Sequence, residues 1–353
     1  MVAARARLIL LPMWKKVVLG ILTGVVVLGG GGLVILYLRK PAQAPPSAVR
    51  VARTPQRLAR GKYLFEAVAD CAGCHSPRDF TRVGAPEFKD QRGSGNVFSD
   101  FLIGMPGVLV AANITPDMET GIGGWSDGEK IRAIREGVDR DGNALFPMMP
   151  YSTYRHMSDE DVEALVAYMD TLPPVRHAMP KTQISFPVNL LIKSAPQPAG
   201  SVPPPDRTNR VRYGQYLAQV AGCGDCHTPA EKGQPVPGME FAGGQVFASK
   251  AGTVVSANIT PDMDTGIGKW PEEFFQKKLH EYSDYAEHGA PPLPGPRAFT
   301  LMPWLAYTNL ASEDISAIYA FLRTVKPVRH SVETHPEPVK TASLRVPLDH
   351  HDR

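Results

Sequence analysis

The stretch Cys71-Ala72-Gly73-Cys74-His75 recurs as Cys223-Gly224-Asp225-Cys226-His227, and these two copies contain all four cysteines of the 353-residue chain. Two thiols one helical turn apart can each add to a vinyl group on one edge of a porphyrin, and the adjacent imidazole then lies beneath the iron. The sequence therefore predicts two covalently bound haem c groups. The predicted attachment points are Cys71, Cys74, Cys223 and Cys226, and the predicted iron ligands are His75 and His227.

Other uses of a Cys-x-x-Cys pair remain open from the residues alone. A thioredoxin-like dithiol and half of a zinc site have the same spacing, but neither requires a histidine directly after the second cysteine, and here that histidine occurs twice. The remaining alternatives are one functional and one decayed haem site, or a disulfide within each pair. The chain has no fifth cysteine for another disulfide or a thiolate catalyst.

An uncharged apolar segment, residues 17–38, lies near the N-terminus. As a helix rising about 1.5 Å per residue it spans roughly 33 Å, which is enough to cross a bilayer. A cleaved signal peptide is the alternative, because Ala42-Gln43-Ala44 resembles a cleavage site, but Pro45 and the length of the apolar run favour a retained anchor. Basic residues flank both ends of the segment, so charge alone leaves its orientation open.

Haem attachment decides the expected orientation. In bacteria covalent haem ligation takes place on the outer side of the inner membrane. We therefore predict an inner-membrane protein with a cytoplasmic N-terminus and with its haem domains in the periplasm. The net charge of +3 is too small to dictate a partner, and no nucleic-acid-binding motif is present.

The rest of the chain consists of two similar halves. Ala112-Asn113-Ile114-Thr115-Pro116 corresponds to Ala257-Asn258-Ile259-Thr260-Pro261, and Pro174-Val175-Arg176-His177 corresponds to Pro327-Val328-Arg329-His330. We predict a cytoplasmic stub and transmembrane anchor (1–38), a Pro/Ala-rich tether (39–56), a first haem domain (57–178), a Pro-rich linker (179–208), a second haem domain (209–331) and a C-terminal tail (332–353).

Each half reads as a helical module. Helices are expected over residues 56–69 and 209–221, each leading into a cysteine motif, and over residues 159–172 and 313–325 at the end of each half. Ser158 is the expected N-cap of the first closing helix, and a capping box at Ser126 predicts a middle helix that Gly137 ends. Tyr168 and Phe321 occupy matching places on the closing helices. We expect each to pack over the glycine of its own first helix, Gly61 or Gly214.

A second axial ligand would close each haem iron to small molecules and raise its potential. Met149 and Met302 are the predicted ligands, because both precede a proline and an aromatic residue in a loop before the closing helix. Proline favours an extended backbone at the methionine, which leaves its side chain free to face the ring. A methionine that only fills the hydrophobic core is the alternative role for Met149 and Met302. The alternative ligands are the matched pair Met118 and Met263 and the histidines His156, His177, His288 and His330.

Two further matched pairs are candidate haem-contacting residues. Trp125 and Trp270 follow Gly-rich turns, and Asn113 and Asn258 lie in the Asn-Ile-Thr-Pro segments. We predict that these residues line the haem edge or bind its propionates. The alternative interpretation is that the tryptophans belong to the core and that the asparagines fix a loop.

Together these features resemble the c-type cytochromes that serve as membrane-bound subunits of periplasmic alcohol and gluconate dehydrogenases. The resemblance covers roughly residues 57–330 and rests on the two cysteine motifs, the Asn-Ile-Thr-Pro-Asp segments and the Met-Pro-aromatic loops. It implies a mainly α fold, with an N-terminal transmembrane helix followed by two tandem class I cytochrome c domains. Those subunits usually carry three haems and are often signal-cleaved, whereas this chain has two motifs and an N-terminal apolar segment.

The expected function is electron relay and not substrate chemistry. A dehydrogenase or a quinol-oxidising complex would reduce one haem, and the other haem would pass electrons to a cytochrome c or an oxidase in a respiratory chain. The tether would let the haem domains reach between these partners. The alternative is a dihaem cytochrome c peroxidase, which needs one haem that opens for peroxide. The Met-Pro loop in both halves argues against such an open site.

Overall fold

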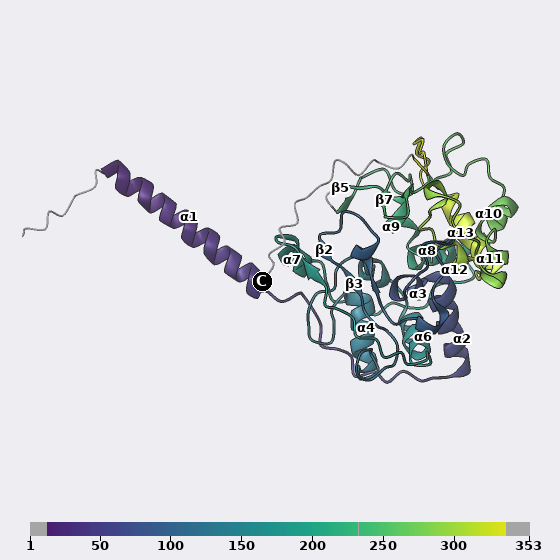
Figure 1. Cartoon of the computed structure of the whole chain (residues 1–353), viewed down its shortest axis with the longest axis horizontal. Helices are drawn as coiled ribbons and strands as arrows, with labels where there is room; N and C mark the ends of the chain where they lie inside the picture. Colours follow the sequence, from purple (N-terminus) through teal and green to yellow (C-terminus); the bar gives the residue numbers. More distant parts are fainter. Residues whose placement is uncertain (1–12, 232, 337–353) are drawn as a thin grey trace, which may run out of the picture.

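A computed structural model describes residues 13–231 and 233–336. The chain forms a long N-terminal helix and a helical body built from two halves (Figure 1). The α-helices are α1 (Met13–Leu38), α2 (Pro55–Tyr63), α3 (Cys71–His75), α4 (Asp127–Glu136), α5 (Tyr151–Tyr154), α6 (Asp159–Met169), α7 (Val188–Leu191), α8 (Arg210–Val220), α9 (Cys223–His227), α10 (Glu272–Leu279), α11 (Ser283–His288), α12 (Trp304–Tyr307) and α13 (Ser312–Leu322). The predicted cytoplasmic stub up to residue 12 and the tail from residue 337 lie outside the described residues.

The strands are short and form two-stranded antiparallel ribbons. The pairs are β1 (Asn96–Val97) with β3 (Val110–Ala111), β2 (Gly107–Val108) with β4 (Gln183–Ile184), β5 (Ala230–Glu231) with β6 (Gln234–Pro235), and β7 (Val246–Ala248) with β8 (Thr253–Val255). Helices therefore supply the framework, and the expectation of a mainly α protein is confirmed.

Helix α1 projects away from the body (Figure 1). None of residues 14–38 is buried in the protein. Residues 14–38 are long and apolar enough to cross a membrane. An apolar helix of this length with no protein partner would leave a large hydrophobic surface in water. Burial in lipid would remove that surface.

The first and last helices of each half cross at a glycine. A Cβ atom added to Gly61 of α2 would lie 1.9 Å from the carbonyl oxygen of Ala164 in α6, and one added to Gly214 of α8 would lie 1.8 Å from that of Ala317 in α13. Tyr168 also lies over Gly61, as expected. Its counterpart Phe321 is not among the nearest neighbours of Gly214, which are the backbone atoms of the closing helix.

The predicted helices are present, but the two closing helices end at Met169 and Leu322, three residues before the expected ends. The helix expected over residues 56–69 changes after Tyr63 into a π-helical turn, Leu64–Val68, which buries four of its five residues. The capping box at Ser126 is formed, Gly137 ends α4 in a left-handed conformation, and the Ser158 hydroxyl accepts a hydrogen bond from the amide of Asp161. Side-chain capping at these positions follows from the local sequence.

One hydrophobic core extends through both halves, and matched hydrogen bonds join them. The Tyr63 hydroxyl donates to Asp314 at 2.7 Å and accepts from the amide of Ala311 at 3.1 Å. The Tyr216 hydroxyl donates to Asp161 at 2.6 Å and accepts from the amide of Ser158 at 3.2 Å. The residues of these bonds occupy equivalent positions in the two halves: Tyr63 and Tyr216, Asp161 and Asp314, and Ser158 and Ala311. The two halves are therefore held by a pseudo-symmetric interface.

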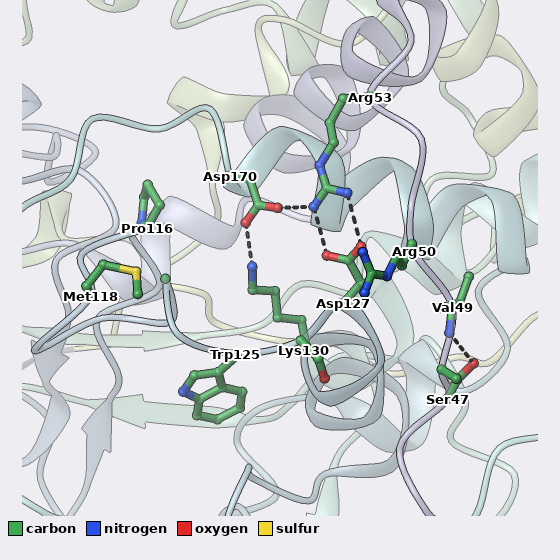
Figure 2. A pocket seen from close by; sticks show the side chains of 13 residues that line it. Ser47, Val49, Arg50, Arg53, Pro116, Met118, Trp125, Asp127, Lys130 and Asp170 are labelled. Atoms are coloured by element: carbon green, nitrogen blue, oxygen red, sulfur yellow. Dashed lines mark hydrogen bonds and ion pairs between the residues drawn. The ribbon is translucent and has the colours of Figure 1, made fainter.

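The Pro/Ala-rich segment expected to be a tether is instead an ordered strap on the first half. Pro41 and Val51 are buried, and the amide of Val51 donates to Asp127 of α4 at 2.7 Å. Arg53 then bridges Asp127 and Asp170, as Figure 2 shows. The expectation that this segment lets the haem domains reach between distant partners is wrong, because these contacts hold it against the body.

The Pro-rich linker between the halves is also bound to the first half. Arg135 of α4 donates to the carbonyl oxygen of Gly200 at 2.7 Å, and the backbones of Asp159 and Val202 are joined by a hydrogen bond of 2.9 Å. Ribbon β2–β4 pairs the start of the linker with the first half. Specific contacts therefore hold both the strap and the linker between the halves against the first half.

The glycine crossings give a stability prediction. We expect Gly61→Ala and Gly214→Ala each to lower the free energy of unfolding by about 1–3 kcal/mol, because the added methyl group would overlap a backbone carbonyl. Gly200→Ala is the control, since nothing lies within 4 Å of its added methyl group. Denaturant unfolding of the three variants measures the effect. Equal stabilities for all three would contradict the close crossing.

Candidate haem-binding sites

The two cysteine motifs form the short helices α3 and α9. None of the four cysteines forms a disulfide; Cys71 and Cys223 are half-buried, and Cys74 and Cys226 are exposed. The structure thus does not adopt the alternative of a disulfide within each pair. A left-handed residue, Asp70 or Gly222, precedes each helix and turns the chain into it.

The thiols are poorly suited to dithiol redox chemistry or to work as thiolates. Burial raises the pKa of the half-buried Cys223 thiol to about 12. Reactive Cys-x-x-Cys pairs instead require a lowered pKa. The Cys74 and Cys226 thiols are exposed, so a molecule outside the protein can reach them.

Each motif histidine is held by one backbone carbonyl. His75 Nδ1 lies 2.7 Å from the carbonyl oxygen of Ala112, and His227 Nδ1 lies 2.7 Å from that of Ala257. A carbonyl can only accept, so Nδ1 carries the proton and Nε2 keeps its lone pair. Burial also lowers the pKa of both imidazoles, which favours the neutral form that binds iron. A histidine that binds a metal usually donates its other ring N–H to such a carbonyl, which orients the ring.

The residue after each of these carbonyls is the predicted site asparagine. The side-chain nitrogen of Asn113 donates to the carbonyl oxygens of Val175 and His177, at 2.8 and 3.3 Å, and to the Thr120 hydroxyl. Its side-chain oxygen accepts from the amide and hydroxyl of Thr115. Asn258 makes the same set of contacts in the second half. These contacts use both polar atoms, so the structure favours the loop-fixing interpretation over propionate binding.

His177 and His330, considered above as rival ligands, brace the same loops. Their Nδ1 atoms lie 3.0 Å from the carbonyl oxygens of Ser94 and Ala242, and their backbones join the asparagine networks. Both side chains are half-buried. Their presence at equivalent positions of the two halves is the sequence signal for this structural role.

The two predicted methionine ligands occupy equivalent loops. Met149 and Met302 are partly buried against the common core, and the carbonyl oxygen of each accepts a hydrogen bond from the amide two residues later, at 2.8 and 2.7 Å. The rivals Met118 and Met263 are 72% and 55% exposed. His156 and His288 are exposed as well. Met149 and Met302 thus remain the candidates that the structure favours.

The predicted site tryptophans are half-buried at the edge of the core. Each follows the same turn, because the amides of Trp125 and Trp270 donate to the carbonyl oxygens of Ile122 and Ile267 at 3.0 Å. The Trp270 ring also packs edge-to-face on Phe274. Within the described part of the chain neither indole nitrogen donates to a protein group, so both remain candidates for binding a propionate.

Comparison with known proteins agrees with this geometry. The cytochrome c family matches this chain twice, over residues 58–173 and 211–326. The chain belongs to the cytochrome c family. Each matched region contains one cysteine motif, one asparagine loop and one Met-Pro loop, so the two halves are tandem cytochrome c domains.

Several curated proteins are similar to this cytochrome. It is 32% identical over 287 residues to the fructose dehydrogenase cytochrome subunit of Gluconobacter japonicus, a match that covers 78% of this chain and 54% of the relative. It is 29% identical to the gluconate 2-dehydrogenase cytochrome c subunit of Pantoea cypripedii, over 75% and 59% of the two chains. A dihaem cytochrome c of Cereibacter sphaeroides is 31% identical over 58% and 67%. The cytochrome thus spans little more than half the length of the two dehydrogenase subunits.

The protein carries two covalently bound haem c groups, and the side chains described above fit them. Each domain offers two thiols on one short helix, a neutral imidazole with Nε2 available, and a thioether on the Met-Pro loop. These are the attachment points and axial ligands that a haem c requires. The motif histidine and the asparagine have equivalent hydrogen-bond partners in the two domains.

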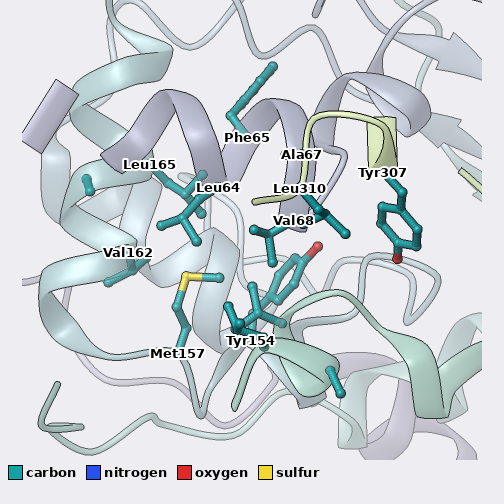
Figure 3. Close-up of a cluster of buried hydrophobic side chains, with 14 of the residues drawn as sticks. Leu64, Phe65, Ala67, Val68, Tyr154, Met157, Val162, Leu165, Tyr307 and Leu310 are labelled. Atoms are coloured by element: carbon teal, nitrogen blue, oxygen red, sulfur yellow. The ribbon is translucent and has the colours of Figure 1, made fainter. Parts of the chain in front are cut away.

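The cysteine motifs of the two domains face one another across the interface. Thr153 of α5 donates to Asp225, inside the second motif, at 2.9 Å. Cys74 and Cys226 are near enough that ionisation of Cys226 would raise the pKa of the Cys74 thiol. Two buried tyrosines that the sequence did not single out, Tyr154 and Tyr307, belong to the common core, as Figure 3 shows, and lie near both motifs. Tyr307 donates to the carbonyl oxygen of Ala221, just before its own motif, at 3.0 Å.

The asparagine loops give a prediction that separates their two interpretations. We expect Asn113→Ala to lower the free energy of unfolding by about 2–3 kcal/mol, because it leaves several buried polar groups without partners. The control is Asn309→Ala, which removes an exposed asparagine. Denaturant unfolding of the haem-loaded protein is the measurement. Unchanged stability with an altered potential of the first haem would instead indicate propionate binding.

The residue before each cysteine motif differs between the domains and predicts different pH behaviour. Burial raises the pKa of the Asp70 carboxyl to about 7, opposed by the charge of Arg78, whereas Gly222 carries no charge. As pH rises through this value the carboxylate forms and stabilises ferric iron. The potential of the first haem should therefore fall by tens of millivolts, on the order expected for one charge in a partly buried site.

Asp70→Asn should remove this pH dependence. The amide oxygen of asparagine can still accept the hydrogen bond from the amide of Gly73, so the start of α3 is retained. Potentiometric titration of both haems at several pH values checks the prediction, with the second haem as an internal control. The same pH dependence in the variant would show that another group is responsible.

Proposed function

We propose that this cytochrome is a membrane-anchored dihaem electron relay. The observation that carries the proposal is the placement of two equivalent haem-binding motifs that face one another at the interface of two domains with one shared core. Two haems held in this way would exchange electrons directly, without leaving the protein. The haem iron supplies reversible one-electron exchange, and the protein supplies its ligands, burial and fixed position.

The proposed iron ligands are His75 with Met149 in the first domain and His227 with Met302 in the second. The four cysteines would hold the porphyrins as thioethers. The carbonyl oxygens of Ala112 and Ala257 would keep each imidazole oriented and make it a better donor to iron. Histidine and methionine together are typical of haems that transfer electrons at high potential.

The interface between the domains supports rapid exchange. The paired bonds of Tyr63 with Asp314 and of Tyr216 with Asp161 fix how the domains are docked. Both carboxylates also lie near the helix crossings of their own domains, so that the docking geometry is tied to the fold. A rigid interface keeps the distance between the two haems constant, and electron exchange then needs no domain movement.

We further propose that α1 anchors the cytochrome in the inner membrane, with its N-terminus in the cytoplasm and both haem domains in the periplasm. The length and apolar character of α1 support the anchor. The ordered strap after α1 would keep the first domain close to the membrane surface.

The relatives suggest the electron donor. Three of them are named as cytochrome subunits of fructose, gluconate and alcohol dehydrogenases. We propose a periplasmic dehydrogenase as the donor, with a quinol-oxidising complex as the alternative. A cytochrome c or a terminal oxidase would accept the electrons. Affinity purification of the full chain from membranes in mild detergent, followed by identification of the associated subunits, tests the donor.

The rival function is a dihaem peroxidase, and a spectrum distinguishes the two. A relay should show two low-spin ferric haems that neither bind cyanide quickly nor consume hydrogen peroxide. The similar position of Met149 and Met302 against the core supports closure of both irons. A high-spin haem that reacts rapidly with peroxide would overturn the relay in favour of the enzyme.

The methionine ligands give a specific prediction. We expect Met149→His to lower the potential of the first haem, because a second imidazole stabilises ferric iron, while haem content and the potential of the second haem stay unchanged. Met118→His is the control, because Met118 is exposed. Redox titration followed by absorption measures both haems. If the variant and the control had the same potentials as the parent protein, another residue would be the ligand.

A further inference from the structure

One surface of the body exposes large apolar side chains beside the end of α1. We call residues 185–193 the α7 segment; it contains α7 and follows strand β4. Phe186 and Leu191 in this segment are 68% and 60% exposed. Figure 1 shows α7 next to the C-terminal end of α1.

The α7 segment is nevertheless firmly attached to the first domain. The amide of Ser185 donates to the carbonyl oxygen of Pro106 at 2.7 Å, directly after the β2–β4 pairing. Leu190 is buried, and Ile184 packs on a small second core around Phe98 and Leu109. Exposure of Phe186 and Leu191 is therefore a fixed property of this surface. Burying both would remove a substantial apolar area from water.

Direct contacts place this segment at the end of the membrane helix. The Lys193 ammonium donates to the carbonyl oxygen of Tyr37 at 2.6 Å and lies 5.5 Å from the centre of the Tyr37 ring. Tyr37 is the penultimate residue of α1. If α1 spans the bilayer, a group that contacts Tyr37 lies at the outer boundary between lipid and water. Lysine and aromatic side chains are both favoured at that boundary.

The body cannot move far from this boundary. Pro41 is already buried against the body, and it is only three residues after Leu38, the last residue of α1. Three extended residues span about 10 Å at most. The basic residues Arg39 and Lys40 lie in this short connection, where they can meet lipid phosphates.

From these contacts we propose that the α7 segment is a second membrane contact, in which Phe186 and Leu191 insert into the outer leaflet beside α1. The occupant of this apolar surface is the lipid bilayer. The inference rests on the anchoring role proposed for α1. With two contacts the body has a defined orientation, in which the side that carries α7 faces the membrane and α10, at the opposite end of the body in Figure 1, faces the periplasm.

The test measures how deeply single positions lie in lipid. The variants F186C and L191C, in the full haem-loaded chain, are labelled with a nitroxide and placed in nanodiscs of phosphatidylethanolamine and phosphatidylglycerol. The native cysteines are consumed by haem attachment and do not react with the label. The matched control is F274C, because Phe274 is an exposed aromatic residue of α10. Haem content and the absorption spectrum verify that each variant is folded.

Collision of the nitroxide with oxygen, which concentrates in lipid, is compared with collision with a water-soluble nickel chelate. We expect the oxygen-to-nickel ratio at positions 186 and 191 to be several-fold higher than at position 274. Equal ratios at all three positions, with the chain retained in the nanodisc, would overturn this inference and leave the α1 anchor intact. Failure of the chain to enter nanodiscs would refute the anchor itself and the inference with it.

Discussion

The hydrogen bond between each motif histidine and a backbone carbonyl is the interaction on which both sites depend. In each domain it fixes the protonated nitrogen of the imidazole and leaves the other nitrogen for iron. The carbonyl is held in turn by the adjacent asparagine, whose side chain joins the loop to the segment after the closing helix. The orientation of the ligand is thus tied to the packing of the whole domain.

Duplication gives this protein two copies of one site, and the interface makes a single unit of them. The same tyrosine and aspartate positions are used in both directions, so each domain supplies the donor for one bond and the acceptor for the other. The copies differ where Asp70 in one domain is replaced by Gly222 in the other. Such a difference can separate the potentials of two otherwise equivalent haems, because a nearby charge affects one iron and not the other.

The connections are as ordered as the domains. A strap rich in proline and alanine, which composition alone would assign to a flexible spacer, is held by Asp127 and Asp170 through Arg53. The linker between the domains is bound in the same way by Arg135. Consequently specific contacts set the position of the haem domains relative to α1. These contacts support the proposed orientation at the membrane.

The sequence by itself determined the cofactor, the duplication, the apolar helix and most helix boundaries, because these depend on local spacing, caps and periodicity. It also indicated Met149 and Met302, since both halves repeat the same loop. Only the tertiary structure showed that Asn113 and Asn258 fix their loops, that the strap binds the first half, and that the two cysteine motifs face one another. Each of these depends on groups far apart in the chain, such as Tyr63 with Asp314, whose proximity no local pattern records.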